Sequence, residues 1–181
     1  RYGRFLQDSG LRDMNISVNL SARQLLDGKL ADRIGDILDR TGFPSASLEL
    51  EITESMVMHD ADRAVMLLDK LRQLGVGVAI DDFGTGYSSL AYLKRFPINC
   101  VKIDRSFIRD LPKDTGDGAI TRSIIALAQN MDLNVVAEGV ESEQQFDFLN
   151  AYGCHEAQGY LFSAPIPPPA LETYLEQSRA A

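Results

Sequence analysis

Six short runs of strand-forming residues in this chain each end in side chains that can bind a metal ion or a phosphate. In chain order, the terminal residues are Asn19, Glu51, Asp81 with Asp82, Lys102 with Asp104, Glu138 and Gln158. In a parallel β/α architecture the carboxyl ends of all strands meet on one face of the molecule. We therefore expect these side chains to converge on one site.

The pair Asp81 and Asp82 is central to this prediction. Adjacent residues on a strand point to opposite faces, so both can serve one site only where the strand ends and the chain turns. Residues 83–86, with two glycines, would supply that turn. Two carboxylates held close together repel each other unless cations neutralise them. The alternative interpretation is a solvated acidic pair before a turn, which is a common arrangement.

The other strand-end residues favour a metal site built from oxygen ligands. Asn19, Glu51 and Glu138 offer amide and carboxylate oxygens, and no cluster of Cys or His competes with them. Such ligands favour hard cations, here Mg²⁺ or Mn²⁺. Two such ions can clamp both reacting oxygens of a phosphodiester. Lys102 could then orient or deprotonate the attacking water, or offset charge on the phosphate.

Two further acids lie three residues beyond strand-end glutamates. Glu54 could hold the glycine-containing loop after Asp82, and Glu141 repeats the spacing after the fifth run. The alternative for each is an ordinary carboxylate in the first turn of a helix, which Glu54 taken alone would favour. His59 and His155 are isolated in the sequence, so we assign them no role.

Composition predicts one globular domain of a cytoplasmic protein. The chain has 181 residues, 45% of them hydrophobic, and a net charge of −8. Without a basic run, it is a poor candidate for binding a nucleic-acid polymer. Cys100 and Cys154 lack metal-type spacing and suit reduced, buried thiols. No stretch is long and apolar enough for insertion into a membrane, and no signal peptide opens the chain.

Helical patterns follow each predicted strand. They cover roughly residues 22–40, 59–75, 88–95, 117–131, 142–152 and 169–178. This alternation predicts an α/β fold with a mostly parallel sheet, specifically an incomplete TIM-like (β/α) barrel of about six units. Residues 2–11 resemble the last turns of a further helix. A complete, open six-stranded sheet is the alternative.

At these residues the chain resembles the EAL family of cyclic di-GMP phosphodiesterases. The matching segments are Val18-Asn19-Leu20-Ser21, Glu51-Ile52-Thr53-Glu54-Ser55, residues 81–90, Lys102-Ile103-Asp104-Arg105-Ser106-Phe107, Glu138-Gly139-Val140-Glu141 and Gln158-Gly159-Tyr160. They occur in family order and cover residues 14–163. The resemblance implies a barrel that hydrolyses cyclic di-GMP to linear pGpG with Mg²⁺ or Mn²⁺.

The resemblance also implies roles for individual residues. The implied metal ligands are Asn19, Glu51, Asp81, Asp82 and Glu138. Lys102 resembles the lysine that contacts the nucleophilic water, and with Asp82 and Glu138 it forms the implied catalytic set. Glu54 resembles the acid that anchors the loop after Asp82, which the family ties to substrate binding and dimerisation. Glu141 and Gln158 match supporting positions.

One departure from the family pattern qualifies these expectations. The Glu-Ala-Leu signature precedes the Asn19 segment in family members, and this chain begins too late to contain it. We therefore expect residues 1–181 to be the C-terminal three quarters of an EAL domain, with the early strands absent. The parent would be fused to sensor or cyclase domains and could form a homodimer. The alternatives are a catalytically inactive receptor for cyclic di-GMP, or an isolated open barrel prone to aggregation or pairing.

Overall fold

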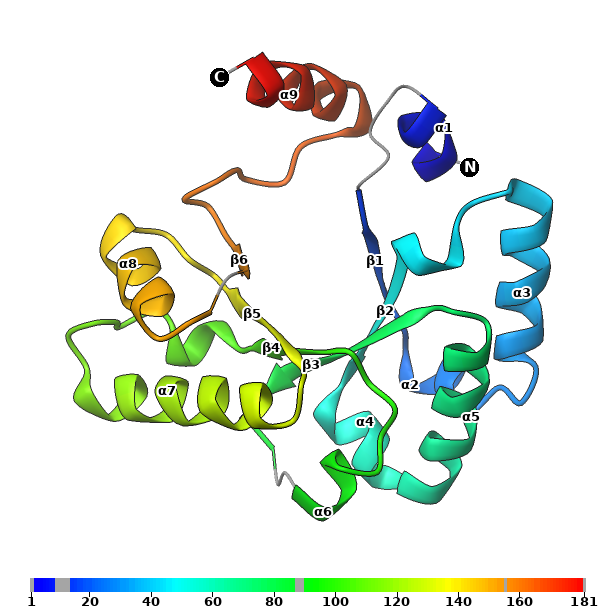
Figure 1. Cartoon of the computed structure of the whole chain (residues 1–181), viewed down its shortest axis with the longest axis horizontal. Helices are drawn as coiled ribbons and strands as arrows, with labels where there is room; N and C mark the ends of the chain where they lie inside the picture. Colours follow the sequence, from blue (N-terminus) through cyan, green and yellow to red (C-terminus); the bar gives the residue numbers. More distant parts are fainter. Residues whose placement is uncertain (1, 9–13, 87–89, 155, 181) are drawn as a thin grey trace.

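A single curled sheet of six parallel strands organises the computed structural model (Figure 1). The structure describes residues 2–8, 14–86, 90–154 and 156–180. The strands lie side by side in sequence order: β1 (Ile16–Asn19), β2 (Leu48–Thr53), β3 (Gly77–Phe83), β4 (Cys100–Ile103), β5 (Asn134–Glu138) and β6 (Glu156–Gln158). All neighbouring pairs are parallel, as the alternating sequence pattern predicts.

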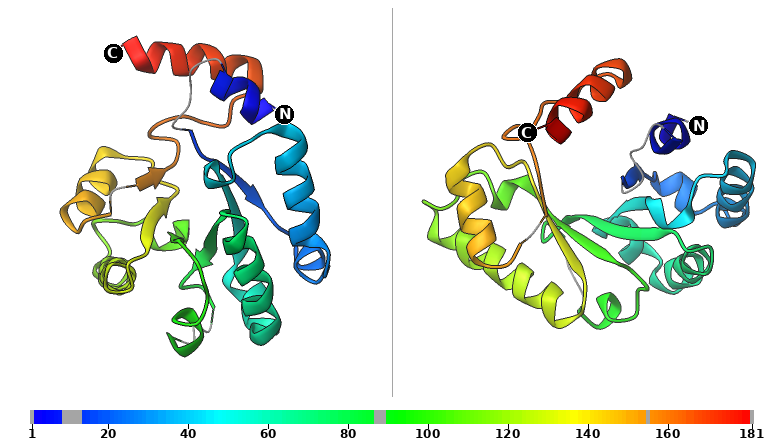
Figure 2. Two further views of the ribbon diagram at one scale, coloured as in Figure 1. Left: turned by 45° about the vertical axis from the view of Figure 1, so that its right-hand side comes forward. Right: turned by 45° about the horizontal axis from the view of Figure 1, so that its top comes forward.

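Helices connect the strands and cover the convex face of the sheet (Figure 2). Their bounds are α1 (Tyr2–Asp8), α2 (Ala22–Leu25), α3 (Leu30–Thr41), α4 (Glu54–His59), α5 (Ala61–Gln73), α6 (Leu90–Leu93), α7 (Thr115–Asn130), α8 (Glu143–Ala151) and α9 (Pro168–Ala180), with single 3₁₀ turns η1 (Ser45–Ser47) and η2 (Arg105–Phe107). The helices and the alternating strands match the predicted α/β organisation.

The hydrophobic core lies between the sheet and these helices. Leu68 and Leu71 of α5 are fully buried, as are Val78 of β3 and Ile103 of β4. Strand residues alternate between the two faces, so the apolar set packs against the helices while the polar set points into the concave side. Burial of the apolar set therefore fixes which polar side chains face the concave side.

The sheet curls but does not close. Among the described residues, β1 and β6 are the two ends of the strand order and do not pair with each other. Helices α1 and α9 lie beside each other over this opening (Figure 1), where the hydroxyl of Tyr2 donates to the carbonyl oxygen of Pro168 at 2.6 Å. The fold is a half-barrel, which confirms the prediction of an incomplete barrel with six βα units.

One predicted helix is divided in the structure, and another agrees with its predicted bounds. The segment 22–40 contains α2 and α3, with a turn near Gly28 between them. The helix predicted over 59–75 is α5, and the Asp60 side chain accepts the N–H of Arg63 and caps its start. Gly75 follows the end of α5 in the left-handed conformation, with φ 78°. Leu11, residues 88 and 89, and His155 lie outside the described residues.

No helix within the described ranges has both the length and the apolar character needed to cross a membrane.

Both cysteines are buried and unpaired, as the sequence predicts. Burial raises the pKa of the Cys100 thiol to about 12 and that of Cys154 to about 11. Neither thiol is therefore a nucleophile near neutral pH.

A close backbone approach at Gly159 joins β6 to the segment after β5. The N–H of Val140 donates to the Gln158 carbonyl and that of Leu161 to the Val140 carbonyl, both at 3.0 Å. A Cβ atom at position 159 would overlap the backbone of Val140. We expect Gly159→Ala to lower the free energy of unfolding by more than about 3 kcal/mol, the upper range for overpacking.

Urea unfolding followed by circular dichroism would measure this loss. Gly28→Ala is the matched control, because nothing lies within 4 Å of a Cβ atom at that position. It should be neutral or stabilising by up to about 1 kcal/mol. Equal stabilities of the two variants would contradict the close approach.

Candidate active site

The strand ends identified in the sequence lie along one edge of the curled sheet. Asn19 of β1 is aligned with Glu51 of β2, and Glu138 of β5 is aligned with Gln158 of β6. Lys102 lies on β4, between these two pairs in the strand order. The parallel register therefore explains why residues from distant parts of the sequence share one edge.

An irregularity in β3 brings two adjacent aspartates to this edge. Ile80 is aligned with Val101 of β4, and Phe83 is aligned with Ile103. Three steps along β3 thus match two steps along β4, which defines a β-bulge. We expected the strand to end at the aspartates. That expectation is wrong, because β3 continues to Phe83 and the bulge, rather than the strand end, redirects the side chains.

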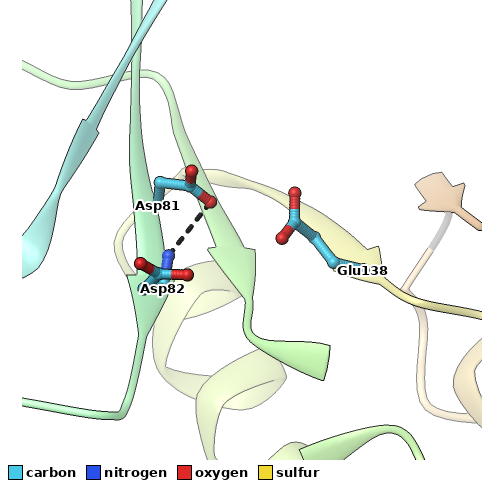
Figure 3. Close-up of side chains that lie close together, drawn as sticks. All are labelled: Asp81, Asp82 and Glu138. Atoms are coloured by element: carbon cyan, nitrogen blue, oxygen red, sulfur yellow. Dashed lines mark hydrogen bonds between the residues drawn. The ribbon is translucent and has the colours of Figure 1, made fainter. Parts of the chain in front are cut away.

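The backbone at the bulge is itself unusual. Asp82 adopts the left-handed conformation with φ 53°, which Asp and Asn tolerate better than most residues. Its N–H donates to Oδ1 of Asp81 at 3.0 Å, so the first aspartate helps to fix the second (Figure 3). Strained backbone of this kind clusters at functional sites.

Three carboxylates from two strands lie close enough to share a cation. One oxygen from each of Asp81, Asp82 and Glu138 lies within 4.8 Å of the other two. The Glu138 carboxylate extends from β5 towards that of Asp81 (Figure 3). Carboxylate oxygens in such a group suit a hard divalent cation. The residues present therefore fit a divalent metal ion.

Lys102 occupies the centre of the acidic cluster. Its side chain is only 5% exposed, and its Nζ lies 2.8 Å from Glu51 Oε1, 2.5 Å from Glu138 Oε1 and 3.8 Å from Asp81 Oδ1. Burial favours a lower pKa for Lys102, but the hydrogen bonds to Glu138 and Glu51 outweigh burial and raise the pKa above its ordinary value. In this arrangement Lys102 is an ammonium group, suited to orienting ligands and offsetting charge rather than to removing a proton.

Two acidic side chains of the cluster, Asp82 and Glu138, are more difficult to ionise than ordinary carboxyl groups. Burial is the largest cause that raises the pKa of Asp82, followed by the charges of Asp81 and Asp104. Burial also raises the pKa of Glu138, although the hydrogen bond from Lys102 opposes this. A nearby cation favours the ionised form of each acid, so a divalent ion would relieve both effects.

Glu54 is placed to support the loop that follows the aspartates. It is the first residue of α4, is 4% exposed, and accepts the N–H of Gly84 at 3.1 Å through Oε2. Its Oε1 would lie 2.9 Å from a Cβ atom at Gly86, so only glycine leaves room there. This geometry agrees with the loop-supporting position that the resemblance implies for Glu54.

The remaining predicted residues lie at the margins of the cluster. The side chains of Asn19, Glu141 and Gln158 are exposed. Glu141 uses its backbone N–H to bind Gln145 Oε1 at 2.7 Å. The roles predicted for these three side chains stay predictions.

Asp104 is a neighbour of the acidic cluster. It was predicted to lie at a strand end, and no role was predicted for its side chain. Its charge contributes to raising the pKa of Asp82. Its own pKa is lowered because hydrogen bonds from Ser106 outweigh the effect of burial. Asp104 lies two residues after Lys102, so strand alternation predicts that both side chains share one face of the strand. This spacing was the signal in the sequence that could have assigned Asp104 to the site.

A protein-family model matches most of the chain. The model of the EAL domain matches residues 2–165. The chain belongs to the EAL family. This confirms the resemblance expected from the motifs.

Curated relatives of this EAL chain include two proteins of Pseudomonas aeruginosa. It is 47% identical over 176 residues to cyclic di-GMP phosphodiesterase NbdA, covering 97% of the chain and 22% of NbdA. It is 48% identical over 167 residues to the bifunctional diguanylate cyclase/cyclic di-GMP phosphodiesterase MucR, covering 92% of the chain and 24% of MucR. The chain thus spans about a quarter of the length of these relatives.

Solved EAL structures share the fold. The MucR phosphodiesterase in complex with c-di-GMP has a TM-score of 0.91 and 47% identity, with 94% of this chain and 69% of that chain covered. The EAL domain of Mycobacterium smegmatis DcpA has a TM-score of 0.92 and 41% identity, with 97% and 79% covered. BlrP1 of Klebsiella pneumoniae in a manganese/cyclic di-GMP complex has a TM-score of 0.81 and 31% identity, with 91% and 42% covered.

Proposed function

We propose that this EAL chain carries the active site of a cyclic di-GMP phosphodiesterase that forms linear pGpG with two divalent cations, Mg²⁺ or Mn²⁺. One observation carries the proposal: acidic side chains from β2, β3 and β5 converge around Lys102 in a member of the EAL family. Two relatives at 47% and 48% identity are named as cyclic di-GMP phosphodiesterases, which supports the same substrate here.

The charge of the cluster supports more than one cation. In the described part of the site, the four carboxylates of Glu51, Asp81, Asp82 and Glu138 surround one ammonium group, that of Lys102, so three negative charges remain when all are ionised. Bound divalent cations would neutralise this excess, lower the pKa of water and offset the charge of a phosphodiester. The manganese complex of BlrP1 supports a divalent ion of this kind.

The chain's own residues would bind and orient the reacting groups. Asp81, Asp82 and Glu138 would hold one ion, and Glu51 with Asn19 would complete the ligands of a second. Lys102 fixes Glu51 and Glu138 through its two short contacts and places a positive charge beside the site. Formation of pGpG requires water to add to phosphorus while the bond from phosphorus to the 3′ oxygen breaks.

Hydrolysis by the chain itself tests this proposal. With cyclic di-GMP and Mn²⁺ or Mg²⁺, we expect chromatography to show pGpG as the product. Excess EDTA should abolish its formation, because the clustered carboxylates would then have no divalent counter-ion. Adding Mn²⁺ back in excess over EDTA should restore it.

Binding measured by calorimetry in EDTA separates the enzyme from a receptor. Tight binding of cyclic di-GMP without metal, together with no product when metal is added, would support an inactive receptor and contradict the proposed activity. Product that forms equally well in EDTA would contradict the metal-dependent mechanism.

A further inference from the structure

The side chain of Gln145 forms hydrogen bonds with the backbone of two different segments. This residue of α8 is 5% exposed. Its Oε1 accepts the N–H groups of Glu141 and Ser142, at 2.7 and 3.0 Å. Its Nε2 donates to the carbonyl oxygens of Ile108 and Arg109, at 3.2 and 3.0 Å. A carboxamide offers two donors and two acceptor sites, so this buried side chain is fully satisfied.

The two segments leave neighbouring strands of the proposed active site. One of them, with residues 108–109, follows β4 and η2, and the other, residues 139–142, connects β5 to α8. The last aligned pair between β4 and β5 is Ile103 with Ala137, so Glu138 lies one residue beyond the shared ladder. Past that point, the carboxamide from α8 joins the two segments.

The position of the Glu138 carboxylate depends on both segments. It contacts Nζ of Lys102 on β4 at 2.5 Å, and it is one of the three carboxylates that could share a cation. The next residue, Gly139, turns with φ 69° and lies against the side chain of Arg105 in η2. On the β6 side, the same segment is held by two backbone hydrogen bonds of Val140. On the β4 side, the carboxamide supplies the corresponding link.

A cap for α8 explains only half of the contacts of Gln145. The residue forms a capping box with Ser142, whose Oγ accepts the N–H of Gln145 at 3.4 Å. In a capping box, the side chain of the third helical residue needs only to accept a backbone N–H. The two donor contacts to residues 108–109 add nothing to the cap. They indicate a second role, in holding the segment after β5 against the segment after β4.

We propose that Gln145 is a positioning residue that fixes the segment after β5, and with it the Glu138 carboxylate, in the arrangement required for binding a divalent cation. The inference deepens the proposed function and rests on it, because it concerns the same metal site. Gln145 acts through the backbone and is not assigned as a ligand. Groups that fix metal ligands from outside typically contribute about 10–100-fold to metal affinity or activity.

Mn²⁺ affinity in the absence of nucleotide tests this role, with free Mn²⁺ measured by electron paramagnetic resonance. Gln145→Glu keeps an acceptor for the two N–H groups, but it turns a carboxylate oxygen towards two carbonyl oxygens in place of the donors. We expect the Mn²⁺ dissociation constant to rise by about 10-fold or more, although the added negative charge alone would favour a cation. Gln145→Ala should raise it by a similar factor. Half-maximal hydrolysis of cyclic di-GMP should need a correspondingly higher Mn²⁺ concentration.

Gln129→Glu is the matched control at the opposite edge of the sheet. Nε2 of Gln129 donates to the carbonyl oxygens of Tyr152 and Gly153, at 3.5 and 3.2 Å, so this variant makes the same change of charge and of donors. Gln129 and its partners precede β5 and β6, whereas the proposed site lies where the strands end. The control should bind Mn²⁺ as the original chain does.

The outcomes separate a positioning role from a structural or electrostatic one. Unchanged or tighter Mn²⁺ binding by Gln145→Glu would overturn the inference, and so would an equal loss in Gln129→Glu. Should Gln145→Ala fail to unfold cooperatively, Gln145→Glu decides. Should both fail, Gln145→Asn, which is too short by one methylene to join both segments, carries the same expectation. Absence of Mn²⁺ binding by the original chain would overturn this inference and the proposed metal site together, whereas the other outcomes affect Gln145 alone.

Discussion

Replacing Lys102 with methionine should lower the free energy of unfolding of the metal-free chain by about 3–5 kcal/mol. Lys102 is buried and lies within 2.8 Å of both Glu51 and Glu138, and Glu51 is itself 6% exposed. Methionine has a similar length but no charge, so the variant leaves the buried carboxylate of Glu51 and the half-buried one of Glu138 without a counter-ion. Breaking one partner of a buried ion pair costs far more than the pair contributes, because the remaining charge is uncompensated.

Urea unfolding in EDTA, repeated with excess Mn²⁺, measures this effect. We expect Mn²⁺ to restore part of the lost stability, because an ion that binds only the folded chain stabilises it by mass action and can replace the missing charge. Lys113→Met is the control at an exposed lysine and should change stability by no more than about 0.5 kcal/mol. A loss below about 1 kcal/mol for Lys102→Met in EDTA would contradict the buried ion cluster.

Asp82→Asn should reduce hydrolysis of cyclic di-GMP by at least about 100-fold, the upper range for residues that merely support metal ligands. The proposed role of Asp82 is more direct, because its oxygen lies in the three-carboxylate group. The fold should persist. Asparagine tolerates the left-handed conformation that Asp82 adopts at φ 53° as well as aspartate does, so the bulge can still form.

The same variant should be at least as stable as the original chain at pH 7 without metal. The pKa of Asp82 is raised by burial and by Asp81, so the folded state binds its proton more tightly than the unfolded state. Stability from this group is therefore present at acidic pH, below the unfolded pKa, and declines as pH rises through the unfolded and then the folded pKa. Asparagine removes this decline, and the advantage of the variant should vanish near pH 3.

Thermal unfolding between pH 3 and 7 and a turnover assay test the two halves of this prediction separately. Asp82→Ala is the matched comparison: it should also lose turnover, but it should be less stable than the Asn variant, because alanine is disfavoured at positive φ. Turnover like that of the original chain in Asp82→Asn would rule out the proposed metal role. An Asn variant that is much less stable at pH 7 would contradict the charge repulsion at this position.

The strand ends could be predicted from sequence because strands leave a local signal. Runs such as 76–80 and 133–137 are apolar and end in polar residues, and parallel strands share one edge wherever they lie in the chain. That reasoning correctly brought together Glu51, Lys102 and Glu138. The division of residues 22–40 into α2 and α3 was not predicted, because a short turn inside a periodic apolar pattern does not interrupt the pattern.

The bulge at Asp81 and Asp82 could not be predicted in the same way. It depends on the register between β3 and β4, which is set by packing over the whole sheet rather than by neighbouring residues. Local patterns thus locate the edge of the sheet, and long-range register determines which acids meet there.

The bulge also has a consequence for protein engineering. A regular strand presents every second residue to a given face, so one strand end normally offers one ligand to a site. By accommodating an additional residue, β3 offers two consecutive carboxylates from a single strand. Transfer of this ligand pair to another barrel would therefore require an insertion rather than a substitution, together with a residue that accepts positive φ at the inserted position.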